Sequence, residues 1–184
     1  MKRSLSHILV AAIFTLTLFS CMEEQDFGQI DDLNVTPTLA SGIFYLESDE
    51  ETINSVGAFN TFYSKTVNFD AFNQEFVAER LLEGVIIYEI ENTTSKRLRI
   101  DIEFLDESGV QLYSESFDPI EAYPSETLIR EVFYGPGGES LSILANTSSL
   151  RVTGRNLGDA TSVSSQPEPR IVVRSGAEFL FRLK

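Results

Sequence analysis

Apolar and polar side chains alternate along much of this chain, as they do in a strand that has one buried face. The clearest example covers residues 97–105, where apolar residues at even-numbered positions alternate with Arg, Asp and Glu. The sequence Asp106-Glu107-Ser108-Gly109 then predicts a hairpin loop, and residues 110–117 return as the partner strand. We expect residues 85–92 to join this hairpin in a three-stranded meander.

Further strands are expected at 38–47, 65–71, 126–134, 149–155, 170–174 and 177–183. One short helix is predicted at 74–83, because Asn73 can cap its first turn and Gly84 can end it. Another helical turn is expected near 139–146. Many short strands separated by turns indicate an all-β fold, an antiparallel β-sandwich of about seven to nine strands over residues 38–184.

The start of the chain follows a different pattern. Lys2 and Arg3 precede an uncharged apolar run from Ile8 to Phe19. This run is shorter than the roughly 20 residues that a membrane-spanning helix needs. Residues 1–20 therefore indicate a signal peptide that is removed on export.

Cys21, the only cysteine, follows this apolar run directly. The sequence Leu18-Phe19-Ser20-Cys21 resembles the lipobox of bacterial lipoproteins. This resemblance implies that Cys21 becomes the N-terminus and carries a covalent lipid that holds the protein on a membrane. A secreted protein with an unmodified cysteine is the alternative.

Acidic residues surround the expected anchor. Glu23, Glu24 and Asp26 resemble the surface-export signal of lipoproteins of the Bacteroidetes type, which implies an outer-membrane protein that faces the cell exterior. Residues 21–37 thus form an acidic tether that ends at Pro37, and residues 38–184 form the sandwich domain.

Composition excludes several classes of function. Without residues 1–20 the chain has 164 residues, with 28 acidic and 12 basic side chains, so it repels nucleic acid. His7, the only histidine, is lost with the signal peptide, and Cys21 is used for the lipid. No imidazole or free thiol remains for a nucleophile or a zinc site. We expect a protein that is not an enzyme and needs no cofactor; a carboxylate-dependent hydrolase remains an alternative.

Two groups of residues are candidates for binding. The acidic run Glu47, Asp49, Glu50 and Glu51 could supply oxygen ligands to calcium, but a solvated, charged loop is the favoured interpretation, because the run lacks the spaced Asp or Asn ligands and the glycine of a calcium loop. Aromatic residues are concentrated between 59 and 76, where core packing is the favoured interpretation. Tyr63 is the member that we expect to be exposed if any of them contacts a ligand.

Two resemblances concern the folded part. Residues 85–134 are similar to immunoglobulin-like sandwich domains, with an Asn-containing turn at 92–94 and the Asp106 to Gly109 hairpin. The whole chain resembles small surface lipoproteins of the Bacteroidetes type. This resemblance implies a non-catalytic, lipid-anchored module that interacts with another envelope protein. A glycan-binding lipoprotein of a nutrient-uptake system is the alternative.

Overall fold

The computed structural model describes residues 35–69 and 78–182, all within a folded unit that begins at Val35. The expectations for Cys21, Glu23, Glu24, Asp26 and the signal peptide lie outside the described residues. The strands are β1 (Thr38–Asp49), β2 (Thr61–Asn68), β3 (Leu81–Asn92), β4 (Leu98–Leu105), β5 (Gln111–Ile120), β6 (Leu128–Tyr134), β7 (Ser149–Asn156) and β8 (Arg170–Phe181). The helices are α2 (Glu50–Ser55) and α4 (Leu141–Asn146).

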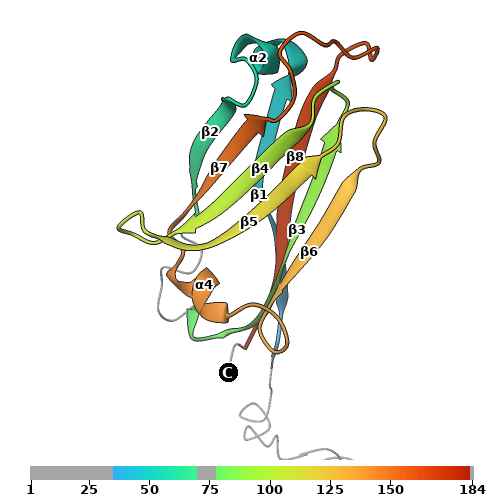
Figure 1. Cartoon of the computed structure of the whole chain (residues 1–184). Coiled ribbons are helices and arrows are strands. Elements are labelled where there is room, and N and C mark those ends of the chain that lie inside the picture. Colours follow the sequence, from blue (N-terminus) through green and yellow to red (C-terminus); the bar gives the residue numbers. More distant parts are fainter. Residues whose placement is uncertain (1–34, 70–77, 183–184) are drawn as a thin grey trace, which may run out of the picture. The chain divides into compact units, whose positions relative to one another are not determined.

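The strands form two four-stranded antiparallel sheets that face each other (Figure 1), so the predicted all-β sandwich is confirmed. One sheet has the order β1-β8-β3-β6 and the other has the order β2-β7-β4-β5. This order, in which the chain passes repeatedly between the sheets, is that of a jelly roll. It refines the expected immunoglobulin-like layout, which places its strands in a different order.

Several predicted elements differ from those observed. The expected meander is wrong, because β3 pairs with β6 and β8 while β4 pairs with β5 and β7. Residues 170–181 form one strand rather than two. Residues 81–83, placed in the predicted helix 74–83, begin β3 instead, and residues 74–77 of that predicted helix lie outside the described residues. The helical turn near 139–146 is confirmed as α4.

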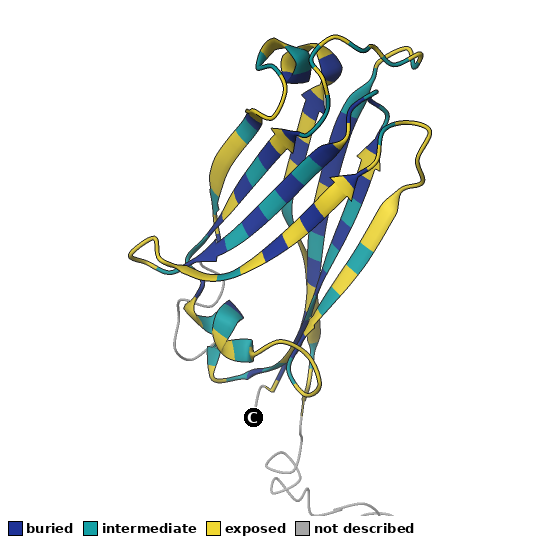
Figure 2. Cartoon of the chain, in the orientation of Figure 1, coloured by how far each residue is buried: buried dark blue, intermediate teal, exposed yellow. Residues whose placement is uncertain are grey.

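The core lies between the sheets and follows the alternation of each strand. Leu98, Ile100 and Ile102 of β4 are fully buried, as the pattern predicts, and β3 supplies Ile86 and Ile90 from the opposite sheet. Burial of one such side chain stabilises the fold by about 1.5–3 kcal/mol. Bands of buried and exposed residues along each strand show this alternation (Figure 2).

The two helices lie at opposite ends of the sandwich (Figure 1). The acidic residues after β1 begin α2, because Asp49 caps it by accepting a hydrogen bond from Thr52 N at 2.6 Å. Among the described residues, no helix has the length and apolar character to cross a membrane.

Candidate functional site

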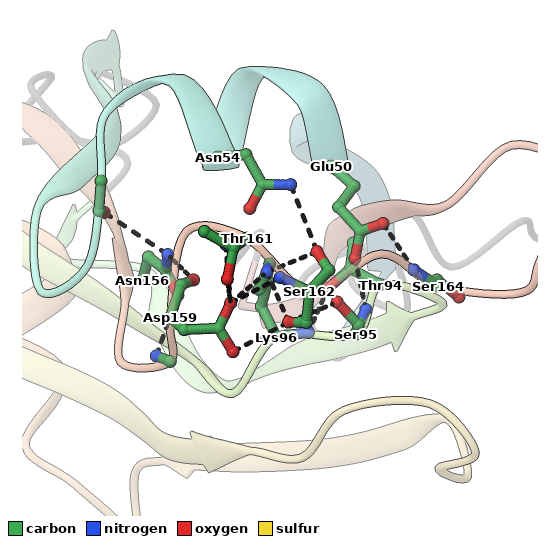
Figure 3. Close-up of polar contacts among 12 residues, drawn as sticks. Glu50, Asn54, Thr94, Ser95, Lys96, Asn156, Asp159, Thr161, Ser162 and Ser164 are labelled. Carbon is green, nitrogen blue, oxygen red and sulfur yellow. Dashed lines mark hydrogen bonds and ion pairs between the residues drawn. The ribbon is translucent and has the colours of Figure 1, made fainter.

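A buried lysine organises the end of the sandwich that carries α2 (Figure 3). Lys96, in the turn between β3 and β4, is 0% exposed. Its Nζ donates to Asp159 Oδ1 at 3.1 Å and to the carbonyl and hydroxyl oxygens of Ser162 at 2.7 and 2.6 Å. A buried ammonium is stable only with such partners. Lys96 therefore fixes residues 157–169, the loop between β7 and β8, on the sandwich.

Glu50 connects α2 to the same region. Its carboxylate is buried and accepts hydrogen bonds from the backbone N–H groups of Ser95 at 2.5 Å and Ser164 at 2.8 Å. Burial raises the pKa of Glu50, but these hydrogen bonds and the nearby Lys96 outweigh it, so its pKa lies below the ordinary value. Glu50 is ionised at neutral pH and holds three segments together.

Two buried asparagines complete the network. Asn92 accepts from Thr94 N at 3.0 Å and donates to the carbonyls of Lys96 and Glu121, both at 2.8 Å. Asn156 accepts from Gly158 N at 2.9 Å and donates to the carbonyl of Asp159 at 2.9 Å. These hydrogen bonds satisfy backbone groups in the turns, where no neighbouring strand pairs with them.

The contact between Lys96 Nζ and Ser162 Oγ has the composition of a serine–lysine catalytic pair, but its chemistry differs. Hydrogen bonds from the backbone of Ser162 and Thr161, and from Lys96, hold the pKa of Asp159 well below its usual range. The carboxylate therefore stays ionised and stabilises the ammonium, which has no lone pair to act as a base. The network is structural.

The four residues of the predicted acidic run have different structural roles. Glu47 accepts hydrogen bonds from Tyr45 Oη at 2.5 Å and from Arg170 at 2.7 Å. Asp49 caps α2, Glu50 is buried, and Glu51 is exposed. A cavity of about 630 Å³ lies beside these four residues. Within residues 35–69 and 78–182, no three Asp, Glu, His or Cys side chains are arranged to bind a metal.

The exposed ring in the aromatic segment is Phe59 rather than Tyr63. Phe59 is 76% exposed, whereas Tyr63 is half-buried against the core. Phe62 and Phe69 are buried, and Phe72 and Phe76 lie outside the described residues. Phe59 has a φ of 61°, in the turn before β2, where its side chain leaves the core.

A second candidate site lies on the outer face of the β1-β8-β3-β6 sheet. Two adjoining cavities of about 290 and 350 Å³ share Glu178 as a lining residue. We call this surface the trough, and define it by Gly42, Val85, Ile87, Phe133, Gly176 and Glu178. The residues come from all four strands, and the ladder places Gly176 beside both Gly42 and Ile87.

Two glycines keep the floor of the trough open. Gly42 and Gly176 are register partners on β1 and β8. A Cβ at Gly42 would meet nothing within 4 Å, and one at Gly176 would meet only the Ser41 carbonyl at 3.5 Å. Neither glycine has a positive φ. Glycine weakens a strand interior and is typical of places where another molecule approaches the backbone.

Carboxylates without ionic partners surround the trough. Glu83 and Glu178 line one of its cavities, and Glu131 lies on the same face of β6 as Phe133, two residues away. In the described part of the chain these three glutamates form no ion pair. Their negative charge is therefore uncompensated.

The outer face of the other sheet neutralises its own charges. Arg99 pairs with Asp101 at 2.8 Å and with Asp118 at 3.2 Å, and Arg151 pairs with Glu103 at 3.1 Å. The β1-β8-β3-β6 sheet also pairs Glu89 with Arg174 and Glu47 with Arg170. The two faces differ around the trough, where the three glutamates have no such partner. Sequence analysis did not predict the trough, because its residues are adjacent only after the four strands have paired.

The described residues thus form a jelly-roll sandwich with an apolar and acidic trough on one face. No protein-family model and no curated protein sequence matches this chain. Among solved structures, it is similar to the VP2 subviral particle of infectious bursal disease virus, with 7% identity, 80% of this chain and 33% of that chain covered, and a TM-score of 0.40. The chain therefore spans about a third of that capsid protein.

Two further solved structures have similar scores. Desmodium yellow mottle tymovirus gives 10% identity, 83% of this chain and 85% of that chain covered, and a TM-score of 0.37. A chain of disulfide-linked pili, the Bacillus endospore appendages, gives 7% identity, 81% and 91% covered, and a TM-score of 0.35. Scores this low imply nothing about function.

Proposed function

We propose that this chain is a non-catalytic, lipid-anchored module of the cell envelope, displayed on the outer membrane, that binds an envelope partner through the trough. The observation that carries the binding role is the trough itself, an open apolar floor surrounded by free carboxylates on a four-stranded sheet. The anchor is supported by the residues from Lys2 to Asp26, which resemble a lipoprotein signal, its lipobox and its export signal.

A hydrolase is less well supported by the same surface. Glu83 and Glu178 share a cavity, but both side chains are exposed to water. A general acid at neutral pH needs an environment that keeps its proton, usually burial in an apolar pocket. The trough offers two solvated carboxylates instead, which suit charge recognition better than proton transfer.

Glycan binding also has limited support. A sugar platform needs neighbouring aromatic rings, and the exposed rings of this sheet are Tyr45 on β1 and Phe133 on β6. These strands are the two edges of a four-stranded sheet, so about 14 Å separates them. One ring at each edge does not make a continuous platform.

Replacing Cys21 by Ser tests the anchor. We expect Cys21→Ser to abolish fatty-acid labelling and to release the protein from the membrane fraction, because the thiol that carries the lipid is gone. Ser20→Ala, which keeps a small residue before the cysteine, is the matched control and should stay labelled. Unchanged labelling of Cys21→Ser would refute the anchor.

Site-specific cross-linking on living cells tests the binding role. A photo-reactive phenylalanine derivative in place of Phe133, an exposed ring of the trough, should give a discrete adduct with an envelope protein. The same residue at Ser114, exposed on the outer face of the other sheet, serves as the control and should not. Absence of an adduct at position 133, or equal adducts at both positions, would contradict the proposal.

A further inference from the structure

We infer that the trough binds an extended protein segment that presents an apolar side chain and, two residues further on, a lysine or arginine. This inference rests on the proposed binding function and adds the chemistry of the partner. It follows from charge complementarity, because the three free glutamates of the trough favour a cationic group and repel an anionic one.

The residues that line the trough determine where the cationic group of the bound segment lies. Glu83 and Glu178 come from the neighbouring strands β3 and β8 and lie in the same cavity, next to Leu180. An ammonium or guanidinium group between them can contact both carboxylates. At the other end Arg174 binds Glu89 at 2.9 Å, so a cation placed there would meet a guanidinium group that already holds this carboxylate.

The position of the apolar group follows from the glycines. Gly42 and Gly176 have no side chains, so the floor between Ile87 on β3 and Ala40 on β1 is open. An aliphatic side chain that binds there can displace water from Ile87 and Ala40. Apolar area removed from water in this way is worth about 25 cal/mol per Å². Phe133, which is 59% exposed, provides further apolar surface at the β6 edge.

The spacing of these two subsites matches an extended chain. Gly176 and Glu178 are two residues apart on β8, which corresponds to about 6.6 Å along the strand. Side chains on one face of an extended segment recur at the same interval, because every second residue points the same way. In a segment that runs in the same direction as β8, an apolar residue over Gly176 therefore places the second residue after it at Glu178.

A second copy of this chain is a poor occupant. The expected mature chain has 28 acidic and 12 basic residues, so two copies repel one another. A symmetric contact through the trough would also bring the same free glutamates together. An oppositely charged segment of another protein gains energy where a second copy loses it.

A peptide titration tests the inference with the unlipidated mature chain, residues 21–184 carrying Cys21→Ser. The probe is the capped pentapeptide Ser-Leu-Ser-Lys-Ser, and its partner probe has Glu in place of Lys. We expect amide shifts in NMR spectra at residues 83–87, 131–133 and 176–180, with at least tenfold weaker binding of the Glu peptide. Raising the salt concentration from 50 to 500 mM should weaken binding of the Lys peptide several-fold.

Variants assign the effect to the trough. The double variant Glu83→Gln with Glu178→Gln should bind the Lys peptide at least fivefold more weakly, while Glu107→Gln, on the β4–β5 loop, should bind normally. Gly176→Leu should block the floor, and Gly42→Val repeats this test on the other strand if Gly176→Leu does not fold. An unchanged amide spectrum away from the trough confirms folding of each variant.

Three outcomes would overturn the inference: no shift in the trough, equal binding of the two peptides, or shifts produced by the neutral sugar cellohexaose instead. The cross-linking experiment separates this failure from failure of the proposed function. A partner captured at position 133 through a segment without Lys or Arg would refute the inference and leave the binding function intact. Absence of any captured partner would refute the function.

Discussion

The charge on Lys96 has no contact with solvent and depends on Asp159, whose side chain is 59% exposed. Removal of one partner from such a pair leaves an uncompensated buried charge, whereas removal of the buried charge itself costs much less. Because Lys96 carries the buried charge, substitution of Asp159 should destabilise the fold more than substitution of Lys96.

We expect Asp159→Asn to lower the melting temperature more than Lys96→Met does. Asp159→Asn keeps the buried ammonium and removes its counter-charge, while Lys96→Met removes the ammonium and keeps most of its apolar stem volume. Thermal unfolding followed by circular dichroism measures both, and the double variant should unfold close to Lys96→Met. A larger loss for Lys96→Met would contradict this account.

Acid should weaken the same region. The pKa values of Glu50 and Asp159 lie below their ordinary values in the folded protein, so both groups bind protons more readily when unfolded. Their contribution is complete above the unfolded pKa values of about 4 and is lost as the pH falls through the lower folded values.

We therefore expect the melting temperature to be level from pH 7 to about pH 5 and to fall below about pH 4. Asp159→Asn should reduce this acid dependence, because it removes one of the carboxylates whose pKa is lowered by folding. Glu107→Gln, on an exposed loop, should leave the dependence unchanged. Melting curves between pH 7 and pH 3 provide the measurement, and an identical slope for Asp159→Asn and the wild type would count against it.

Two glycines within strands, Gly154 and Gly42, have opposite surroundings. In β7 a Cβ at Gly154 would lie 2.6 Å from Phe62 Cζ, so this glycine is required for the close packing of β2 against β7. In β1 a Cβ at Gly42 would meet nothing within 4 Å. Close packing requires a glycine at position 154, whereas the glycine at position 42 lies in the open trough.

A matched pair of alanine substitutions follows from this difference. Gly154→Ala should destabilise the fold by about 1–3 kcal/mol through overpacking against Phe62. Gly42→Ala should be neutral or stabilising by about 0.5–1 kcal/mol, because alanine loses less backbone freedom on folding than glycine. Urea unfolding gives both free energies. Equal losses would show that Gly42 has a structural role.

Local pattern predicted the strands better than it predicted their partners. The alternation at 97–105 reports a strand with one buried face, and β4 has this property. The same alternation contains no information about which strand lies beside it, so β3 was assigned to the wrong sheet. Ser175 and Gly176 suggested a turn inside β8, although glycine there serves an open face rather than a bend.

Helix α2 was not predicted from the sequence for a related reason. Asp49, Glu50 and Glu51 predict a solvated loop, yet a capping Asp followed by acidic residues in the first turn is also typical of a helix start. Only Ile53 and Glu50 of α2 are buried, so the helix has no apolar stripe that could predict it. Its position depends on Glu50 reaching Ser95 and Ser164, which are distant in sequence.

The trough and the proposed anchor together determine where a partner would be met. A lipid on Cys21 would confine the protein to a membrane and raise its effective concentration there. A partner in the same membrane, or one bound to it, would then meet the trough more often than a partner in free solution.

The position of β8 has a consequence for biogenesis. This strand is made after the other seven described strands, yet it lies between β1 and β3 and joins them into one sheet. A nascent polypeptide therefore cannot complete this sheet until translation has reached residues 170–181. For a protein proposed to be exported, this delay keeps the emerging polypeptide unfolded enough to pass through a narrow translocation channel, and the sheet closes only after β8 has passed.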